Sequence, residues 1–199
     1  MGSSTGSSGT PVFVVTGTSG AGKGTLEKAL LVQIPELELA VSATTRERRE
    51  GEEDGREYWF IPDEEFDERL RNGEFLEYVE FPWGQRSGTL RSEIARIQQT
   101  GKVALLDLEP EGALDVKQNV PGAVTIFVEA PSFEENERRL RARATESEGE
   151  IEERLDLARE QLSRSGEFDY LIVNDDVDRA LVELEGIVKK ELSATIPRP

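Results

Sequence analysis

The stretch that decides the fold is Val12-Phe13-Val14-Val15-Thr16-Gly17-Thr18-Ser19-Gly20-Ala21-Gly22-Lys23-Gly24-Thr25. Its apolar start predicts a buried strand, and the residues from Lys23 to Ile34 predict a helix, so the glycines lie where the helix begins. Glycines let the backbone wrap closely around a polyphosphate, whose charge is balanced by inward N–H groups and the helix dipole. The spacing matches the G-x-x-x-x-G-K pattern and predicts a phosphate-binding loop, with Lys23 as its point charge.

One position of this loop departs from the common pattern. Gly24 stands where Ser or Thr usually offers a hydroxyl to Mg²⁺, and Thr25 comes one residue later. We therefore expect Mg²⁺ to arrive with ATP and to be held largely through water and the nucleotide phosphates. No residue is assigned as a direct metal ligand, and a loop retained only as structure is the alternative.

Composition limits the class of protein. The 199 residues suit one domain. The lack of cysteine rules out disulfides, and the lack of histidine as well argues against a structural zinc site. No apolar run is long enough to span a membrane. Residues 1–10, almost all Gly, Ser and Thr, lack the features of a signal peptide and are expected to be a disordered tail. By elimination we expect a cytoplasmic protein.

Charge narrows the choice of partner. Lys and Arg total 24 against 41 Asp and Glu, and the net charge of −17 disfavours polynucleotides and anionic membrane surfaces. Within this acidic background the arginines form two groups, and as groups they indicate anion sites. The groups are Arg46, Arg48 and Arg49, and then Arg138, Arg139, Arg141 and Arg143.

The remaining pattern alternates short apolar runs with amphipathic segments, which predicts an α/β fold: a three-layer P-loop NTPase core with a central parallel sheet. Its ligand crevice would lie at the carboxyl ends of the strands. The expected strands are Val12–Thr16, Val103–Leu108, Val124–Glu129 and Tyr170–Val173, and the expected helices Lys23–Ile34, Ile151–Leu162 and Val177–Leu192.

Two segments interrupt this rhythm. The first, from Val41 to about Ile94, is charged and aromatic and predicts a small inserted subdomain, in which Asp63 caps a helix from Pro62 to Asn72 and short strands cover Glu57–Ile61 and Leu76–Phe81. The second, from Pro131 to about Glu150, is very polar and predicts a mobile flap that buries little of itself. Two polar inserts on a core suggest two ligands that are brought together and covered.

Many short pieces of the chain, in this order and spacing, match one known family: Val41-Ser42-Ala43-Thr44-Thr45-Arg46, Arg49, Gly51-Glu52, Gly55, Tyr58, Gly73-Glu74-Phe75-Leu76-Glu77, Ser87-Gly88-Thr89, Asp107, Ala130-Pro131-Ser132, Arg139, Arg143, Thr145-Glu146, Arg154-Leu155 and Asn174-Asp175-Asp176. This resemblance is to guanylate kinases and covers roughly residues 11 to 190. It implies one domain over residues 11–199, with a core (11–40, 95–130 and 159–195), a GMP-binding insert (41–94) and a helical lid (131–158). The implied reaction is ATP plus GMP giving ADP plus GDP.

The resemblance also implies roles for several of the matching residues. The loop from Gly17 to Thr25, namely Gly17, Thr18, Ser19, Gly20, Ala21, Gly22, Lys23, Gly24 and Thr25, would hold ATP. Arg46, Arg49 and Tyr58 would hold the GMP phosphate, the arginines through forked hydrogen bonds. The lid arginines Arg139, Arg143 and Arg154 would close over the reacting phosphoryl group and exclude water. Arg138 and Arg141 are expected to be solvated surface charges.

Recognition of guanine needs other groups, because phosphate contacts cannot distinguish bases. Glu77 would accept from the adjacent donors of guanine, and Ser42 and Thr89 would supply hydroxyls. Asp107, at the end of an apolar strand, would lie near the Mg²⁺ region and act in catalysis. Glu109, expected on the same side of an extended strand, would lie near the guanine or ribose.

The chain also departs from the family. One of two tyrosines that usually precede the Gly-Ser/Thr pair is missing from Gln85-Arg86-Ser87-Gly88-Thr89, and we hypothesise that Arg86 or Ser87 replaces its phosphate contact. Asp107-Leu108-Glu109-Pro110-Glu111-Gly112 replaces Asp-x-Asp/Glu-x-Gln-Gly, and Arg143-Ala144-Thr145 replaces Arg-Gly-Thr. Two alternatives stay open: a noncatalytic guanylate-kinase-like interaction module, and a monophosphate kinase with another acceptor. A monomer or small homo-oligomer is expected.

Overall fold

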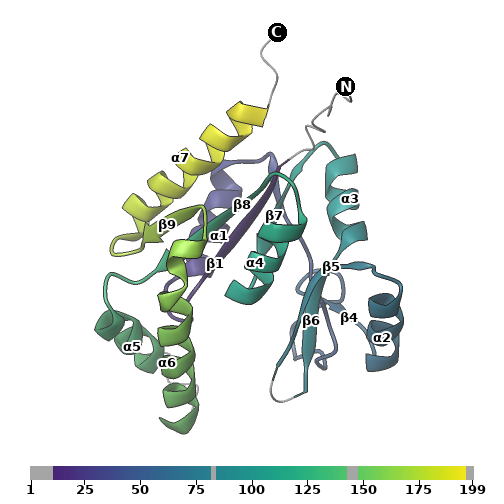
Figure 1. The fold of residues 1–199 in the computed structure, drawn as a ribbon, viewed down its shortest axis with the longest axis horizontal. Coiled ribbons are helices and arrows are strands. Elements are labelled where there is room, and N and C mark those ends of the chain that lie inside the picture. The colour runs from purple at the N-terminus through teal and green to yellow at the C-terminus, as the bar shows by residue number, and fades with distance from the viewer. Residues whose placement is uncertain (1–10, 82–83, 143–147, 196–199) are drawn as a thin grey trace, which may run out of the picture.

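The computed structural model describes residues 11–81, 84–142 and 148–195. Its centre is a five-stranded parallel sheet in the order β2-β7-β1-β8-β9 (Figure 1). The strands are β1 (Val12–Gly17), β2 (Leu37–Leu39), β7 (Val103–Asp107), β8 (Ala123–Glu129) and β9 (Tyr170–Val173). Every residue of β1 is buried, which explains why its sequence is a continuous apolar run rather than an alternating one. The expected central parallel sheet is confirmed.

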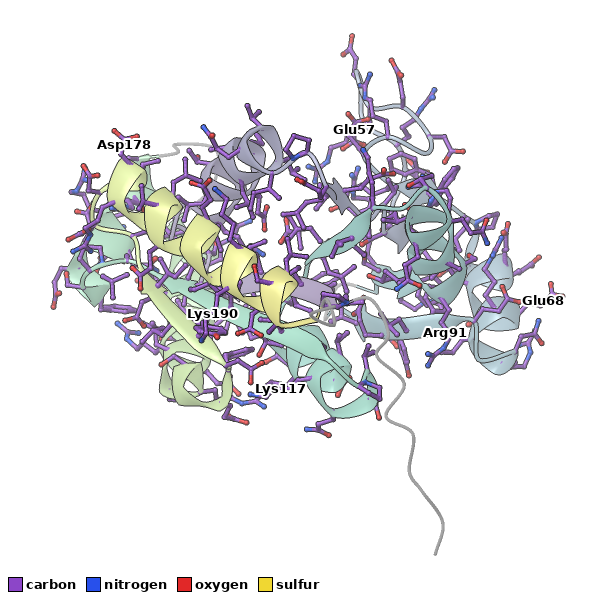
Figure 2. All side chains as sticks on the ribbon, turned by 90° about the horizontal axis from the view of Figure 1, so that it is seen from above. Glu57, Glu68, Arg91, Lys117, Asp178 and Lys190 are labelled. Carbon is purple, nitrogen blue, oxygen red and sulfur yellow. The ribbon has the colours of Figure 1, made fainter. Side chains whose placement is uncertain are left out.

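A second sheet of four strands forms most of the insert, in the order β4-β3-β6-β5. Its elements are β3 (Ala43–Thr44), β4 (Trp59–Phe60), α2 (Asp63–Arg71), β5 (Phe75–Glu80) and β6 (Arg86–Leu90). Phe66 of α2 stacks on Phe75 with ring centroids 4.3 Å apart and gives the insert its own small core. From above, Glu68 and Arg91 project at one end of the molecule and Asp178 at the other (Figure 2).

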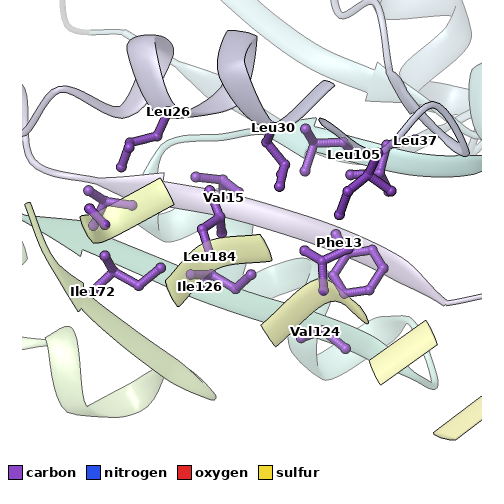
Figure 3. Packing of buried hydrophobic residues seen from close by; sticks show 14 of the residues in the cluster. Phe13, Val15, Leu26, Leu30, Leu37, Leu105, Val124, Ile126, Ile172 and Leu184 are labelled. Carbon is purple, nitrogen blue, oxygen red and sulfur yellow. The ribbon is translucent and has the colours of Figure 1, made fainter. Parts of the chain in front are cut away.

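Alternate residues of β1 point into two separate cores. Phe13 and Val15 pack with α1 (Lys23–Gln33) and α7 (Val177–Thr195), as Figure 3 shows for Leu26, Leu30 and Leu184. Val12 and Val14 lie on the opposite face of the sheet, where they pack with α3 (Arg91–Gln99) and α4 (Pro110–Asn119). Helices on both faces of the sheet make the three layers that the sequence predicts.

The second polar segment is helical where the structure describes it. Residues Phe133–Ala142 form α5 and Glu148–Ser163 form α6, followed by a 3₁₀ turn at Ser165–Glu167. Between Pro131 and Ala142 only Asn136 and Leu140 are buried, so this part buries little of itself, as predicted. Leu140 packs with Ile151 and Leu155 of α6, and Phe133 lies beside them, so a narrow apolar stripe holds α5 on α6.

Two local predictions, the helix cap at Asp63 and the extended position of Glu109, are wrong. Pro62, rather than Asp63, is the N-cap residue of α2, and the Asp63 carboxylate instead accepts a hydrogen bond from Arg86. Strand β7 ends at Asp107, so Glu109 does not continue an extended strand; it is the N-cap residue of α4. Across the described ranges, no helix is long and apolar enough to cross a membrane.

Candidate functional site

The glycine-rich loop between β1 and α1 has a backbone that only glycine tolerates at two points. A Cβ on Gly17 would lie 2.1 Å from the carbonyl oxygen of Val128. Gly22 is the N-cap residue of α1 with φ of 88°, and a Cβ there would lie 2.5 Å from Nδ2 of Asn174. The loop therefore lies at the N-terminus of α1 and at the carboxyl end of β1, where an anion is favoured by the free N–H groups and the helix dipole.

Two buried asparagines hold this loop from below. Asn174 donates from Nδ2 to the carbonyl oxygen of Ala21 at 2.7 Å, and Thr18 donates from Oγ1 to Oδ1 of Asn136 at 3.3 Å. Asn174 Oδ1 and Asn136 Nδ2 are buried and have no hydrogen-bond partner among the described residues. Sequence reasoning gave neither asparagine a role, because each lies in a polar segment where exposure is the ordinary expectation.

Arg139 ties α5 to the same loop. Its guanidinium donates to Glu135 on its own helix at 2.7 Å, to the carbonyl oxygen of Asn174 at 3.0 Å and to that of Ala21 at 3.4 Å. The structure therefore brings Arg139 to the loop, as expected of a lid arginine. Arg154 lies on α6 and is half-buried. Arg143 lies outside the described residues.

The remaining arginines of this group behave as surface charges. Arg138 and Arg141 are exposed on α5 and form ion pairs within it, with Glu135 and Glu137.

Lys23, at the end of the loop, forms an ion pair with Asp107. Asp107 ends β7, and the Lys23 ammonium also donates to the carbonyl oxygen of Leu108 at 3.3 Å. Burial acts against the charge of Lys23, but the charge and hydrogen bond of Asp107, together with the charges of Glu27 and Glu109, outweigh it and raise the pKa of the ammonium. The loop lysine and the strand-end acid, far apart in sequence, form one charged pair.

A third charged residue of this cluster was missed by sequence reasoning. Glu27 lies one turn after Lys23 on α1 and is only 4% exposed. Burial, followed by the negative charge of Asp107, raises its pKa to about 8, while Lys23 acts in the opposite direction. At the sequence level the Lys23 and Glu27 spacing indicates only an ordinary helical ion pair.

The insert holds a second anion site. Both carboxylate oxygens of Glu52 accept from Arg46, at 2.8 and 3.0 Å, and the backbone N–H of Arg49 donates to the same carboxylate at 2.8 Å. The guanidinium carbon of Arg46 lies 5.4 Å from the ring centroid of Tyr58. Here a carboxylate occupies the forked geometry in which arginine also binds phosphate. The side chain of Arg49 is exposed.

Tyr58 connects this second site with the first. Burial raises the pKa of its phenol, and the next largest contribution comes from the charge of Asp107; Arg46 and Lys23 act in the opposite direction. The charges of the loop and of the insert thus act on one side chain. Both groups of charges therefore lie within electrostatic reach of the Tyr58 phenol.

Glu77, on β5, is buried between the insert and the core. Its Oε1 accepts from the backbone N–H of Thr89 at 2.8 Å, and burial raises the pKa of its carboxyl group. The Thr89 hydroxyl is buried and has no hydrogen-bond partner in the part of the chain that the structure describes. Ser42, which precedes β3, is half-buried. A carboxylate and an unpaired hydroxyl are thus available side by side.

The two residues proposed to replace the missing tyrosine are used elsewhere. The Arg86 guanidinium forms ion pairs with Asp63 and Asp67 of α2 and lies 4.6 Å from the Phe66 ring centroid. The Ser87 hydroxyl donates to the carbonyl oxygen of Ala43 at 3.1 Å. Both side chains hold the insert together in the structure, and the hypothesis that either contacts a phosphate stays a prediction.

Glu109 contacts the C-terminal part of α6, which belongs to the predicted core. Its Oε2 accepts from Nε2 of the buried Gln161 of α6 at 3.5 Å. Burial raises its pKa, against the effect of the Lys23 charge. The structure thus places Glu109 between the loop lysine and α6. Its expected contact with the guanine or ribose stays a prediction.

The donor set near the loop suits a metal that arrives on a nucleotide. Within residues 11–81, 84–142 and 148–195 there is no group of three or more His, Cys, Asp or Glu side chains that could hold a metal ion. A Cβ on Gly24 would meet no atom within 4 Å, so the position of the usual hydroxyl is open space. Mg²⁺ held chiefly by phosphates and water fits these residues.

Comparison with known proteins gives this geometry a family. Residues 9–191 match the Guanylate kinase family model. Guanylate kinase of Parasynechococcus marenigrum is 49% identical over 175 residues, which are 88% of this chain and 96% of that protein. Guanylate kinase of Rubrobacter xylanophilus is 44% identical over 186 residues, 94% of this chain and 97% of that protein.

A solved structure agrees. The crystal structure of guanylate kinase from Anaplasma phagocytophilum matches with a TM-score of 0.72 and 29% identity, over 92% of this chain and 86% of that one. The family model, the relatives and the fold agree with the resemblance seen in the sequence: the chain belongs to the guanylate kinase family.

Proposed function

We propose that this chain transfers the γ-phosphoryl group of ATP to GMP or dGMP, reversibly and in line, giving ADP and GDP. The observation that carries the proposal is a pair of cationic groups, Lys23 at the loop and Arg46 in the insert, whose charges both act on Tyr58. Phosphoryl transfer requires mainly the positioning of donor and acceptor and the neutralisation of their charge. Two cationic groups within electrostatic reach of one side chain support such a role.

The donor site is the loop from Gly17 to Thr25. Its backbone N–H groups and Lys23 would hold the ATP phosphates, and Asp107 lies beside the lysine. Mg²⁺ brought by ATP would neutralise charge on the transferring oxygens. The asparagines beneath the loop fix its shape before ATP arrives, so less order has to be gained on binding.

The acceptor phosphate would be held by Arg46, Arg49 and Tyr58. Arg46 already shows the forked arrangement that a phosphate needs, and its guanidinium is fixed against aromatic rings. The base would be read by Glu77, whose carboxylate suits the two adjacent donors of guanine, with Ser42 and Thr89 as hydroxyl partners. A base with mismatched donors would leave buried groups unpaired, which is the source of specificity.

The lid would complete the site. Arg139, with Arg143 and Arg154, would neutralise the reacting phosphoryl group, and closure would exclude the water that otherwise hydrolyses ATP. We assign the core to residues 11–40, 95–130 and 159–195, the GMP-binding insert to 41–94 and the lid to 131–158. The contact of Arg139 with Ala21 supports this assignment, since it joins lid and loop.

The cellular setting follows from the substrates. The protein would act in purine nucleotide metabolism in the cytoplasm, as a monomer or small homo-oligomer, without a polynucleotide or membrane partner. The net charge of −17 supports the absence of a polynucleotide partner.

A panel of acceptors tests the proposal. ADP formation is measured with ATP and GMP, dGMP, AMP, UMP or CMP, and GMP and dGMP should give the highest kcat/KM. Preference for another base would identify a monophosphate kinase with a different acceptor. Binding of GMP without turnover would identify a noncatalytic module. Lys23→Met should abolish turnover while GMP binding and the unfolding transition persist.

The base contact needs its own variant. Glu77→Gln should raise the KM for GMP by about tenfold to a hundredfold, since it exchanges an acceptor for a donor in a buried site. The KM for ATP should not change. Glu80→Gln, on the exposed end of the same strand, is the matched control and should behave as the unmodified protein.

A further inference from the structure

The buried carboxyl group of Glu27 is unused by the mechanism above. It lies on α1, directly behind the phosphate-binding loop, and its Oε1 is buried without a hydrogen-bond partner among the described residues. A buried carboxylate normally has partners for both oxygens, because an unpaired buried charge is costly. Its surroundings show how that cost is avoided.

Two charged groups act directly on Glu27. Lys23 is on the same helix, and Asp107 is at the end of the adjacent strand β7 and within reach of a hydrogen bond from the Glu27 carboxyl group. Lys23 is already paired with Asp107 and also donates to the carbonyl oxygen of Leu108. Around this pair, Glu109 and Tyr58 are the further titratable groups.

The charges of this cluster can be counted. With Glu27 ionised, one ammonium would face two carboxylates in a buried site, leaving a net charge of −1. Burial, and after it the negative charge of Asp107, therefore favour a proton on Glu27. With that proton on Glu27, the carboxyl group can donate to Asp107, and the trio of Lys23, Asp107 and Glu27 is neutral.

We infer that Glu27 keeps a proton at neutral pH and thereby sets the charge that the donor site presents to the phosphates of ATP. Glu27 is thus a positioning residue: it acts through Asp107 and Lys23 and does not touch the nucleotide. The inference rests on the proposal that the loop binds ATP. When the proton is lost to solvent, the trio gains one negative charge, which weakens binding of a polyanion.

The direct test is the titration of Glu27 itself, which needs no nucleotide. Its ¹³C-labelled side-chain carboxyl resonance, assigned through the backbone of the unmodified protein, is followed from pH 5 to 9.5. We expect a midpoint near 8. A midpoint in the ordinary range of glutamate, about 4 to 5, would overturn the inference whether or not the protein is a kinase.

The second test measures the consequence for the nucleotide. The Kd of MgATP is measured by calorimetry without acceptor between pH 7.5 and 9.0, where ATP is fully ionised. Loss of one proton with a pKa of about 8 should raise the Kd over this interval, by up to about eightfold in the limit where only the protonated form binds. Glu27→Gln, a neutral near-isostere, should bind as tightly as the unmodified protein at pH 7.5 and show no such rise.

A matched control separates this effect from general changes at high pH. Glu36→Gln carries the same substitution at an exposed position just beyond α1 and should keep the rise of the unmodified protein. An equal rise in Glu27→Gln, or a constant Kd in the unmodified protein, would overturn the link between Glu27 and ATP. Failure to bind ATP at any pH would instead contradict the proposed function. The carboxyl titration would then still show whether Glu27 is protonated at neutral pH.

Discussion

The Glu77 carboxylate fills the space that a side chain at position 112 would need. A Cβ on Gly112 of α4 would lie 2.6 Å from Oε2 of Glu77. The glycine lies within a helix, where it is less favourable than alanine by about 1 kcal/mol. The insert explains why glycine stands at position 112, since α4 must leave room for the carboxylate of Glu77 on β5.

Gly112→Ala should therefore affect the acceptor and spare the donor. The new methyl group would displace the Glu77 carboxylate, so the KM for GMP should rise about tenfold, the effect of one weakened charged hydrogen bond of about 1.5 kcal/mol. The KM for ATP should stay within twofold. Steady-state kinetics check both values, and Gly186→Ala, in open space on α7, is the control. Equal changes in both KM values would show a general disturbance of α4.

Arg46→Lys should weaken GMP binding even though the charge is kept. Lysine cannot form the two parallel hydrogen bonds that Arg46 makes with the carboxylate of Glu52, and a phosphate would lose the same fork. We expect the KM for GMP to rise at least tenfold. Arg48→Lys, at an exposed neighbouring position, should leave the KM for GMP as it was. A small effect of Arg46→Lys would mean that charge alone, rather than the fork, binds the acceptor.

Two glycines of the loop should respond in opposite ways. Gly22→Ala combines a positive φ with a clash against Asn174 and should lower the free energy of unfolding by about 1 to 3 kcal/mol. Gly24→Ala meets no atom within 4 Å, and the helix propensity of alanine should leave stability equal or raise it by up to about 1 kcal/mol. Urea unfolding at one pH measures both. Equal destabilisation would contradict the fixed shape of the loop.

The pH dependence of stability should carry the signature of Glu27. Its folded pKa, about 8, lies above the unfolded value near 4.5, so the native state binds the extra proton. The associated stabilisation is full below about pH 4.5 and is lost as the pH rises towards 8. In urea unfolding, the difference in stability between the unmodified protein and Glu27→Gln should shift by about 1 kcal/mol per pH unit between pH 5 and 8 in favour of the variant. A constant difference would show an ordinary glutamate.

The sequence predicted those parts of the fold in which one segment carries its own signal. Strands β1, β7, β8 and β9 are continuous apolar runs, and α1 shows an apolar stripe before Pro35. Strand β2 was not predicted, since its three residues alternate and form the edge of the sheet. Helix α4 was missed because Pro110 and Gly112 indicate a break; the structure shows a helix that starts at Pro110 and tolerates Gly112 for the sake of Glu77.

The residues of the site likewise fall into those that the sequence predicted and those that it did not. The loop and the matching residues of the insert were visible in sequence as a local pattern or as part of a family pattern. The contacts beneath the loop were not, because the burial of Asn136 and Asn174 depends on how α5 and the end of β9 meet the loop. The same holds for Arg86, whose carboxylate partners become visible only when α2 is folded beside β6.

The bond between Arg46 and Glu52 means that the fork of the proposed acceptor site is occupied before substrate arrives. A phosphate would have to displace the Glu52 carboxylate from Arg46 before it could take the same fork. Inorganic phosphate should therefore compete poorly with GMP, because it lacks the base contacts that would offset this displacement. Selectivity for a whole nucleotide over its phosphate alone would follow from a bond within the insert itself.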